Sequence, residues 1–418
     1  MRLAVFTSRY PCRTATFFER DMRSLAEAGV ELDVFCIRPA EPELWQYSKG
    51  MDGLDNFSRS RVRHAPLFGT LKNAGRALAT RPREHLADAA SVMWSAMRKG
   101  PLVAAKTASV LPLAWAWAAE SKRYDHVLAY WGNYPGTCAW AFHRLQGRDV
   151  PFSIWLHAGI DLYSRSAYLR EKLRYADNVL TCCEFNRDFI EKEFADEPDV
   201  LSRVHVSHHG LDLADYKFQP DNRKSRTVLA VGRLVPNKGY QYLLWALHVL
   251  KARGVDVMLE FVGDGPEEGA LRRLAQRLNV GHMITWRGWM KPADAGRAMA
   301  EATVLVHPSG GLGDGLPNVV REAMAVGTPV IASNVAGIPD ALADGCGVLV
   351  EPRDPAALAQ AIEQLLDSPE QRRAIAEKAR RRVEQRYDRR RTGQWLASLL
   401  SGTRRRAPSE SAPVALAG

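Results

Sequence analysis

Two carboxylates stand eight positions apart in the segment SGGLGDGLPNVVREAMAVGTPV. Asp314 lies among glycines, and Glu322 lies in a stretch with the apolar spacing of a helix. Pro317 suits the first position of that helix and Gly327 its exit, so the backbone amides near Leu316 would point outward as a seat for an anion or a hydroxyl. A regular helix would separate the carboxylates by roughly 12 Å. Such a pair could hold two hydroxyl-bearing rings of one ligand; a turn former and a surface helix residue are the simpler alternative.

Two cations follow a predicted strand upstream. Arg233 offers a planar fork and Lys238 a mobile point charge, and together they could converge on a diphosphate. In isolation, the same two residues would equally fit the alternative of two ordinary surface cations. Glycines also follow the next two predicted strands, at Gly263, Gly265 and Gly288. A purely structural role would not require so many polar and glycine residues at one edge of a sheet.

The elements that must position these residues alternate regularly. The runs TVLAVGR, VMLEFVGDG, ITWRG, TVLVHPS, PVIAS and GVLVEP each precede a helical pattern, and the last helix begins with Asp354 as N-cap and Pro355 at its first position. This alternation predicts a parallel, doubly wound sheet. Ligands bind beyond the carboxyl ends of such strands, where the residues above lie.

The start of the chain predicts a second α/β unit. The strand RLAVFT, a helix with Phe18, Met22 and Leu25 on one face, Gly29, and the strand ELDVFCI form a βαβ pattern. The first turn lacks the Gly-x-Gly-x-x-Gly spacing, which argues against an NAD-dependent enzyme.

These patterns divide the chain into four segments. We expect a Rossmann-like domain over 1–212, with a helical and membrane-facing or simply packed segment at about 67–120. A second Rossmann-like domain should span 213–385, a C-terminal helix 386–401 should pack back on the first, and 402–418 should be a disordered tail.

Composition limits the partners. The formal net charge of +10 implies attraction to something anionic, which could be nucleic acid, a phospholipid surface or a phosphorylated substrate. The six cysteines have no Cys-x-x-Cys spacing, so neither a zinc site nor disulfides are expected. The N-terminus has no signal-peptide pattern, and the longest apolar run, ASVLPLAWAWAA, is short and contains a proline. We therefore expect a cytoplasmic protein.

Several longer motifs resemble one family. VGRLVPNKGYQYLLWAL, FVGDGPEEGAL and HPSGGLGDGLPNVVREAMAVGTPVIASNVAGIPD are similar to the retaining glycosyltransferases of family 4, and RYPCRTATFFERDM, WGNYPGT, PFSIWLHAGIDLY and SHHGLDLADYKF extend the resemblance into the first half. The branch that assembles exopolysaccharide or colanic-acid-type chains looks most similar. The resemblance implies the α/β GT-B fold, in which two Rossmann-like, doubly wound domains face each other across a cleft.

The resemblance also implies roles for the donor residues. Glu322 matches the glutamate that holds the ribose hydroxyls, and Asp314 takes the place of the glutamate that contacts the donor sugar. Arg233 and Lys238 match the pair that binds the diphosphate and stabilises the leaving group. The matched donor loops comprise Gly263, Gly265, Gly288, Gly315, Leu316 and Pro317. Asp314 is one methylene shorter than the usual glutamate, which affects the choice of donor.

In the first half, His157 matches the motif histidine beside the donor sugar, with Asp161 behind it. A core histidine and a helix N-cap are the structural alternatives. Trp131 and Tyr134 could line an acceptor site or pack a turn. The Trp-rich segment from Trp94 to Trp117 carries nearby cations that could meet a membrane, although helix packing is the simpler interpretation. These cations are Arg81, Arg83, Arg98, Lys99 and Lys106.

The sequence thus predicts a retaining, metal-independent glycosyltransferase without a cofactor, since no Asp-x-Asp pair is present. Its partners would be a UDP- or GDP-sugar and a growing, lipid-linked glycan of cell-surface or exopolysaccharide biosynthesis, at the inner membrane surface rather than on nucleic acid. Two alternatives remain: a nucleotide-sugar epimerase or hydrolase of the same fold, and a noncatalytic glycan- or nucleic-acid-binding protein.

Overall fold

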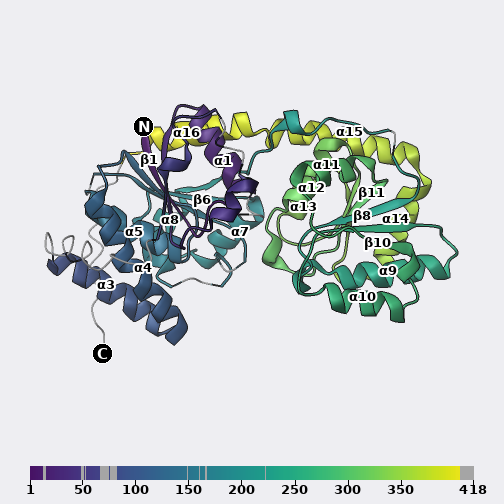
Figure 1. Ribbon diagram of the computed structural model, residues 1–418, viewed down its shortest axis with the longest axis horizontal. Helices are drawn as coiled ribbons and strands as arrows, with labels where there is room; N and C mark the ends of the chain where they lie inside the picture. Colours follow the sequence, from purple (N-terminus) through teal and green to yellow (C-terminus); the bar gives the residue numbers. More distant parts are fainter. Residues whose placement is uncertain are drawn as a thin grey trace. The chain divides into compact units, whose positions relative to one another are not determined.

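The computed structural model describes residues 1–12, 16–48, 51, 53–65, 75, 82–147, 149–159, 161–164, 167–221 and 223–404. The chain divides into two compact units, each with its own sheet (Figure 1). Unit 1 comprises Met1–Cys182, Arg187–Ser207 and the chain from Thr392 onward. Unit 2 comprises Cys183–Asn186 and His208–Arg391. The proposed tail lies outside the described residues from 405 onward, and so do Arg81 and most of 66–80.

Unit 1 is built on a seven-stranded parallel sheet with the order β3-β2-β1-β4-β5-β6-β7. Its strands are β1 (Arg2–Thr7), β2 (Glu31–Cys36), β3 (Val62–His64), β4 (His126–Ala129), β5 (Phe152–Leu156), β6 (Asn178–Thr181) and β7 (Val204–Val206). The strand order reverses between β1 and β4, so the loops after these strands diverge at the carboxyl edge.

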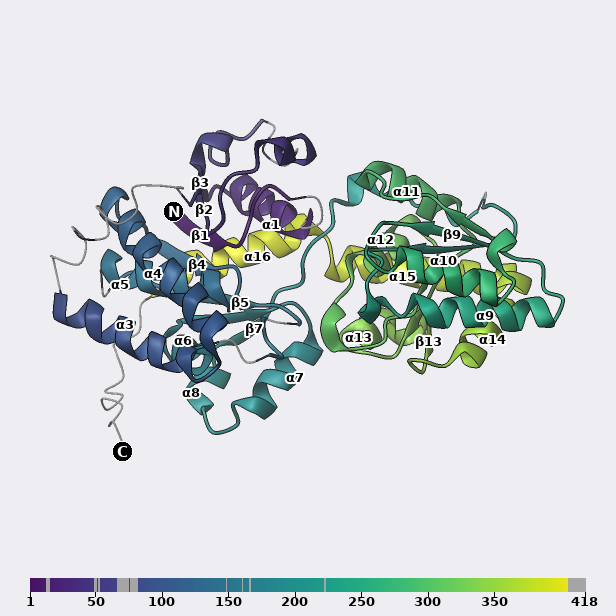
Figure 2. The same ribbon diagram turned by 60° about the horizontal axis from the view of Figure 1, so that its bottom comes forward.

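Helices cover both faces of this sheet (Figures 1 and 2). They are α1 (Thr16–Glu27), α3 (Pro82–Met97), α4 (Pro101–Glu120), α5 (Tyr134–Gln146), α6 (Leu169–Tyr175), α7 (Glu184–Glu193) and α8 (Pro198–Leu201), with short 3₁₀ turns at Pro42–Tyr47 and Arg59–Arg61. The β1 side chains alternate between two cores, as the two-residue period of a strand requires. Leu3 and Val5 pack with α1, whereas Phe6 packs with Trp117 of α4 and Phe142 of α5.

The last helix, α16 (Arg389–Gly402), completes the first of these cores. Leu396 and Leu400 are buried with Leu3 and Val5, and the backbone carbonyl of Leu400 lies 3.1 Å from Nδ1 of the buried His126. Unit 1 is therefore assembled from the two ends of the chain.

Unit 2 has a six-stranded parallel sheet with the order β10-β9-β8-β11-β12-β13. Its strands are β8 (Thr227–Val231), β9 (Met258–Val262), β10 (Ile284–Trp286), β11 (Val304–His307), β12 (Val330–Ser333) and β13 (Val348–Val350). Its helices are α9 (Tyr240–Ala252), α10 (Glu268–Arg277), α11 (Pro292–Glu301), α12 (Asn318–Val326), α13 (Ile338–Leu342), α14 (Pro355–Asp367) and α15 (Pro369–Arg386). All six predicted strands are present, and Asp354 caps α14 by accepting the amides of Ala356 and Ala357 at 3.0 Å.

The described part of the segment before β4 is helical, as predicted for about 67–120. Helix α4 is 20 residues long and continues through Pro112. It is therefore longer than the apolar run ASVLPLAWAWAA. By length and composition, α4 is the one helix of the described chain that could cross a membrane, although a buried core helix meets the same criterion. The second half of α4 is buried in unit 1, including Leu111 and Trp117, whereas Leu102 in its first turn is exposed.

Candidate active site

The glycines after β8 and β9 allow two loops of unit 2 to meet backbone to backbone. A Cβ on Gly263 would lie 2.0 Å from the carbonyl oxygen of Gly232, and one on Gly265 would lie 2.3 Å from that of Leu234. The amide of Gly263 also donates to the carbonyl of Gly288 after β10, at 2.8 Å. The three predicted glycines therefore lie together at the carboxyl edge, where side chains would separate the loops.

Lys238 and Asp314 meet at the same edge. Lys238 Nζ lies 2.5 Å from Asp314 Oδ1, and both side chains are largely buried. The loop bearing Lys238 turns at Gly239, whose φ is +68° and whose added Cβ would lie 2.0 Å from the carbonyl oxygen of Pro308. Because β8 and β11 are neighbours in the sheet, the loops after them bring a cation and a carboxylate from distant sequence positions into contact.

His307, which sequence reasoning missed, holds the other oxygen of Asp314. Its Nε2 lies 2.8 Å from Asp314 Oδ2, and the imidazole is buried at the last position of β11. Burial lowers the pKa of His307, which favours a neutral ring with the proton on Nε2, since a carboxylate can only accept. Burial alone would raise the pKa of Asp314, but His307 and Lys238 outweigh it and hold that pKa well below its usual range. Asp314 is therefore an ionised carboxylate fixed between two donors.

Tyr240, also not predicted, adds a buried hydroxyl beside this cluster. Its Oη has no hydrogen-bond partner among the described residues and would lie 2.7 Å from a Cβ on Gly232. Burial raises the pKa of Tyr240, and the charge of Asp314 raises it further, so the hydroxyl stays protonated and can donate. A buried hydroxyl without a partner is costly, which makes it a candidate contact for a ligand.

Helix α12 carries Glu322 one turn inside its start, with the side chain partly buried. The helix begins at Asn318, so Pro317 is its N-cap and not its first residue as the sequence predicted. The predicted exit at Gly327 is confirmed, with φ +85°. The amides at the start of α12 lie beyond the β11 edge, as an anion seat requires.

The loop between Asp314 and α12 is fixed by the backbone. Gly315 has φ +53°, and its carbonyl accepts the amide of Gly337 at 2.9 Å, while Leu316 is buried. The structure does not bring Arg233 into the cluster. Its side chain is exposed and makes no hydrogen bond or ion pair with the described residues.

Four aromatic rings surround His157 in unit 1. Its imidazole lies after β5, with ring centroids 4.3 Å from Trp131, 5.0 Å from Tyr130, and 5.8 Å from both Phe17 and Trp155. The histidine is buried, at 6% exposed. Trp131 donates from Nε1 to the hydroxyl of Thr7 at the end of β1, at 3.2 Å. Sequence-predicted His157 and Trp131 therefore form one aromatic cluster at the carboxyl edge of the first sheet.

Asp161 ties two loops of this edge together. One carboxylate oxygen accepts the amide of His157 at 2.8 Å, and the other accepts the amide of Asn133 at 3.0 Å. The next helix, α6, begins only at Leu169, so Asp161 does not cap it. Tyr134 begins α5, where Lys106 Nζ lies 5.8 Å from its ring centroid. It therefore packs against α4, consistent with the turn-packing interpretation.

Lys172 is a third residue that the sequence did not single out. It binds the loop after β4, which Asp161 also holds through Asn133. Its buried ammonium lies 2.5 Å from the carbonyl of Gly132 and 3.2 Å from the hydroxyl of Thr137. Burial lowers the pKa of Lys172 to about 7, against the opposing attraction of Asp161. A lysine in a helix pattern normally indicates a solvated face, so this role can be recognised only from the structure.

The titration of Lys172 predicts a pH-dependent stability. Because its pKa is about 7 in the fold and near its ordinary 10.5 in the unfolded chain, the unfolded chain binds more protons between these values. The free energy of unfolding should therefore rise with pH above 7, by up to about 1.4 kcal/mol per pH unit. Urea titrations of unit 1 fluorescence at pH 7, 8 and 9 would measure it. If the free energy of unfolding rises equally steeply with pH in wild type and in Lys172→Met, the prediction is wrong.

Comparisons with known proteins agree with this geometry. Residues 214–382 match the family model described as Glycosyl transferases group 1. WcaL of Escherichia coli K12, assigned as a colanic acid biosynthesis glycosyltransferase, is 26% identical over 96% of this chain and 99% of its own. The GDP-mannose-dependent alpha-(1-6)-phosphatidylinositol monomannoside mannosyltransferase of Mycolicibacterium smegmatis is 34% identical over 56% of this chain and 66% of its own.

Solved structures match the whole fold. HepE of Anabaena in complex with UDP has a TM-score of 0.68 at 18% identity, covering 96% of this chain and 99% of its own. Sucrose-phosphate synthase of Thermosynechococcus elongatus has a TM-score of 0.70 at 21% identity, covering 96% and 98%. The two parallel α/β units thus form the GT-B fold of glycosyltransferases. With the group 1 domain in unit 2, the chain is a glycosyltransferase similar to those of family 4.

Proposed function

We propose that this glycosyltransferase moves a sugar from a UDP- or GDP-sugar to a growing, lipid-linked glycan of cell-surface or exopolysaccharide biosynthesis, with retention at the anomeric carbon and without a metal ion. The contact that joins Lys238, Asp314 and His307 carries the proposal, because a cation and a fixed carboxylate meet there at the carboxyl edge of the unit 2 sheet. The relatives support a nucleotide-sugar donor: HepE is solved with UDP, and the mannosyltransferase is named for GDP-mannose.

Breaking a sugar–phosphate bond leaves negative charge on the departing diphosphate. Preorganised cations and amides stabilise that charge more in the transition state than in the ground state. We expect Lys238 and the amides at the start of α12 to perform this task, and the exposed Arg233 to turn toward a bound diphosphate. When the diphosphate binds, it would share the Lys238 ammonium, which has three hydrogens to donate, with Asp314.

Two carboxylates would orient the rest of the donor. Asp314 accepts from Lys238 and His307, yet each carboxylate oxygen has a second acceptor site for a sugar hydroxyl. Glu322 would hold the ribose hydroxyls. In unit 1, His157 would contact the donor sugar, and Asp161 acts as a positioning residue because it binds the His157 amide. The aromatic face of Trp131 suits an acceptor sugar.

The location is proposed to be the cytoplasmic face of the inner membrane, as a peripheral protein. The exposed side chains Trp94, Met97 and Leu102 of α3 and α4 support it, with Arg98 and Lys99 exposed on the same segment. Apolar side chains flanked by cations are typical of helices that lie on anionic lipid.

Donor binding provides the test of the proposed function. Calorimetry of the full chain against UDP-, GDP-, ADP- and TDP-sugars, with chelator present, should show saturable binding to one nucleotide class. Glu322→Ala should weaken this binding by about tenfold to a hundredfold, since it removes a charged hydrogen-bond acceptor for the ribose. Glu363→Ala, on the surface of α14 and paired with Arg253, is the matched control and should bind as wild type.

Two outcomes would argue against the proposal. No binding to any nucleotide-sugar by the folded protein would remove the donor site. Donor turnover that is equally fast with and without an acceptor glycan would indicate a hydrolase or an epimerase of the same fold. A requirement for added Mg²⁺ or Mn²⁺ would overturn metal independence alone.

A further inference from the structure

The buried hydroxyl of Tyr240 is a polar group of unit 2 that the proposed reaction does not use. Tyr240 begins α9, directly after the turn at Gly239, and is 2% exposed. Its ring packs edge-on against Phe261 of β9, with ring centroids 5.3 Å apart, which fixes the direction of the hydroxyl. Oη has no hydrogen-bond partner among the described residues. Such a hydroxyl has lost its water without gaining a partner, which costs free energy.

This hydroxyl faces the end of β8, beside the side chain of Lys238. A Cβ placed on Gly232 would lie 2.7 Å from Tyr240 Oη and 3.9 Å from Lys238 Cε. Lys238 Nζ in turn lies 2.5 Å from Asp314 Oδ1. The hydroxyl, the lysine side chain and the carboxylate are therefore consecutive neighbours. In agreement with this order, the negative charge of Asp314 adds to the effect of burial in raising the pKa of Tyr240.

Asp314 is a buried charge, so the loss of either of its donors is costly. Its side chain is 6% exposed, with Oδ1 against Lys238 and Oδ2 against His307. A neutral His307 has one ring proton to donate, and Oδ2 already accepts it. If Lys238 moved away, this cluster would leave the carboxylate with one side-chain donor. Removing one partner of a buried charge is strongly destabilising.

A bound diphosphate competes with Asp314 for the ammonium of Lys238. The charge on the diphosphate grows as the sugar–phosphate bond breaks, so the ammonium is drawn further toward it. Tyr240 Oη lies beside the lysine side chain that would move, and its raised pKa keeps the hydroxyl protonated. Rotation about the Cζ–Oη bond can aim this proton without any movement of the packed ring.

We infer that Tyr240 is a positioning residue of the donor site, and that its hydroxyl donates to Asp314 Oδ1 when Lys238 turns to the diphosphate. Because Oη is buried, it acts on the ligand through Asp314 and not by direct contact. The inference rests on the proposed function, which supplies the diphosphate that draws Lys238 away. It adds a second donor that keeps Asp314 ionised and in place during the reaction.

Tyr240→Phe tests the inference with two measurements that a merely structural hydroxyl would change together. The melting temperature of the free protein should stay the same or rise, because the variant removes a buried hydroxyl that has no partner. Binding of UDP or GDP, whichever wild type binds, should weaken by about tenfold, because Asp314 then has no second donor when Lys238 leaves it. Scanning calorimetry measures the first quantity and titration calorimetry the second.

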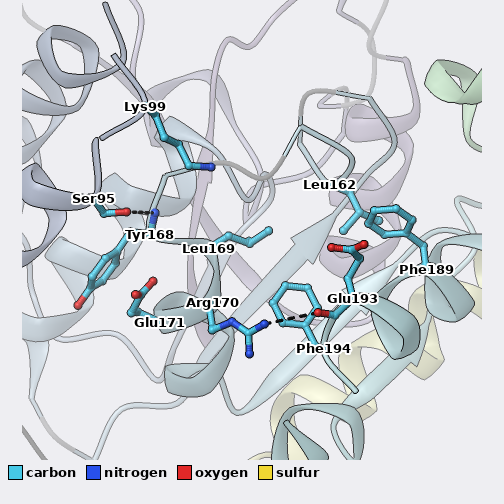
Figure 3. Close-up of a pocket in the computed structure, with 10 residues that line it drawn as sticks. All are labelled: Ser95, Lys99, Leu162, Tyr168, Leu169, Arg170, Glu171, Phe189, Glu193 and Phe194. Atoms are coloured by element: carbon cyan, nitrogen blue, oxygen red, sulfur yellow. Dashed lines mark hydrogen bonds between the residues drawn. The ribbon is translucent and has the colours of Figure 1, made fainter. Parts of the chain in front are cut away.

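Tyr168→Phe is the matched control. Tyr168 is a partly buried tyrosine of unit 1, in the wall of a cavity of about 360 Å³ beside the end of α3 and between α6 and α7 (Figure 3). In contrast to Tyr240, its hydroxyl is hydrogen-bonded, with Ser91 as the partner. The Tyr168→Phe protein should therefore melt at a lower temperature than wild type and bind the nucleotide as wild type does.

A double-mutant cycle tests the contact without any ligand. Lys238→Met removes the ammonium permanently, so the hydroxyl of Tyr240 should already bind Asp314 in the free protein. In that background, Tyr240→Phe should lower the melting temperature by roughly 3 °C or more, since it breaks a hydrogen bond to a buried charge. In the wild-type background, the same substitution should not lower it.

Three results would overturn the inference. They are a Tyr240→Phe protein whose melting temperature falls as much as that of Tyr168→Phe, nucleotide binding by Tyr240→Phe that equals wild type, and an equal effect of Tyr240→Phe with and without Lys238→Met. If wild type binds neither UDP nor GDP, the proposed function is wrong, and the melting temperatures decide whether the hydroxyl reaches Asp314. If Lys238→Met does not fold, nucleotide binding by Tyr240→Phe decides.

Discussion

Replacing Lys238 with alanine should lower kcat/KM for the nucleotide-sugar by about 10²- to 10³-fold. The ammonium lies 2.5 Å from Asp314 in a largely buried pair at the carboxyl edge of the unit 2 sheet, so no other side chain of the cluster can take its place. Its attraction to the diphosphate grows as the bond breaks, so kcat should fall more than KM rises. Initial rates at varied donor concentration measure both.

The matched control for Lys238 is Lys251→Ala. Lys251 is also a lysine of unit 2, but it lies on α9 and donates to the carbonyl of Asn279. It should turn over donor as wild type does. A Lys238→Ala enzyme with the same kcat/KM as the Lys251→Ala enzyme would show that the ion pair with Asp314 is structural.

Replacing Gly239 with alanine should destabilise unit 2 by about 3 kcal/mol and abolish most activity in the fraction that folds. The new Cβ would meet the carbonyl oxygen of Pro308 at 2.0 Å, and the backbone there has φ +68°. Relief requires the loop after β8 to move away from the loop after β11. That movement separates Lys238 from Asp314. Chemical denaturation followed by kinetics on the folded protein would detect both effects.

Gly281→Ala provides the comparison for this backbone effect. Gly281 lies on the surface of unit 2, and an added Cβ there meets nothing within 4 Å. Its substitution should change the free energy of unfolding by no more than about 0.5 kcal/mol. If the two glycine variants are equally stable, the close approach of the two loops is not required.

The convergence of Lys238 and Asp314 was predictable because both follow apolar runs that read as parallel strands. Parallel strands place their carboxyl ends at one edge, so residues after neighbouring strands must lie close together. The glycines were predictable for the same reason. The position of the Arg233 side chain was not predictable, because the strand fixes only its backbone and the long side chain points to solvent.

His307 and Lys172 were not recognised from sequence for a different reason. A histidine at the end of a buried strand has the same spacing whether its ring meets a carboxylate or fills the core. A signal did exist for His307, because it is the polar end of the run VLVH, directly before the site loop. Lys172 gave none, since burial of a lysine depends on carbonyl groups that other elements bring to it.

The return of α16 to unit 1 has a consequence for how the protein is made. One core of unit 1 needs Leu396 and Leu400 against Leu3 and Val5, which are synthesised before the whole of unit 2. Unit 2 lies wholly between these segments and has a core of its own. During synthesis, unit 2 can fold while the apolar face of β1 is not yet covered by α16. The nascent chain is then exposed to aggregation through this uncovered face until α16 has been synthesised.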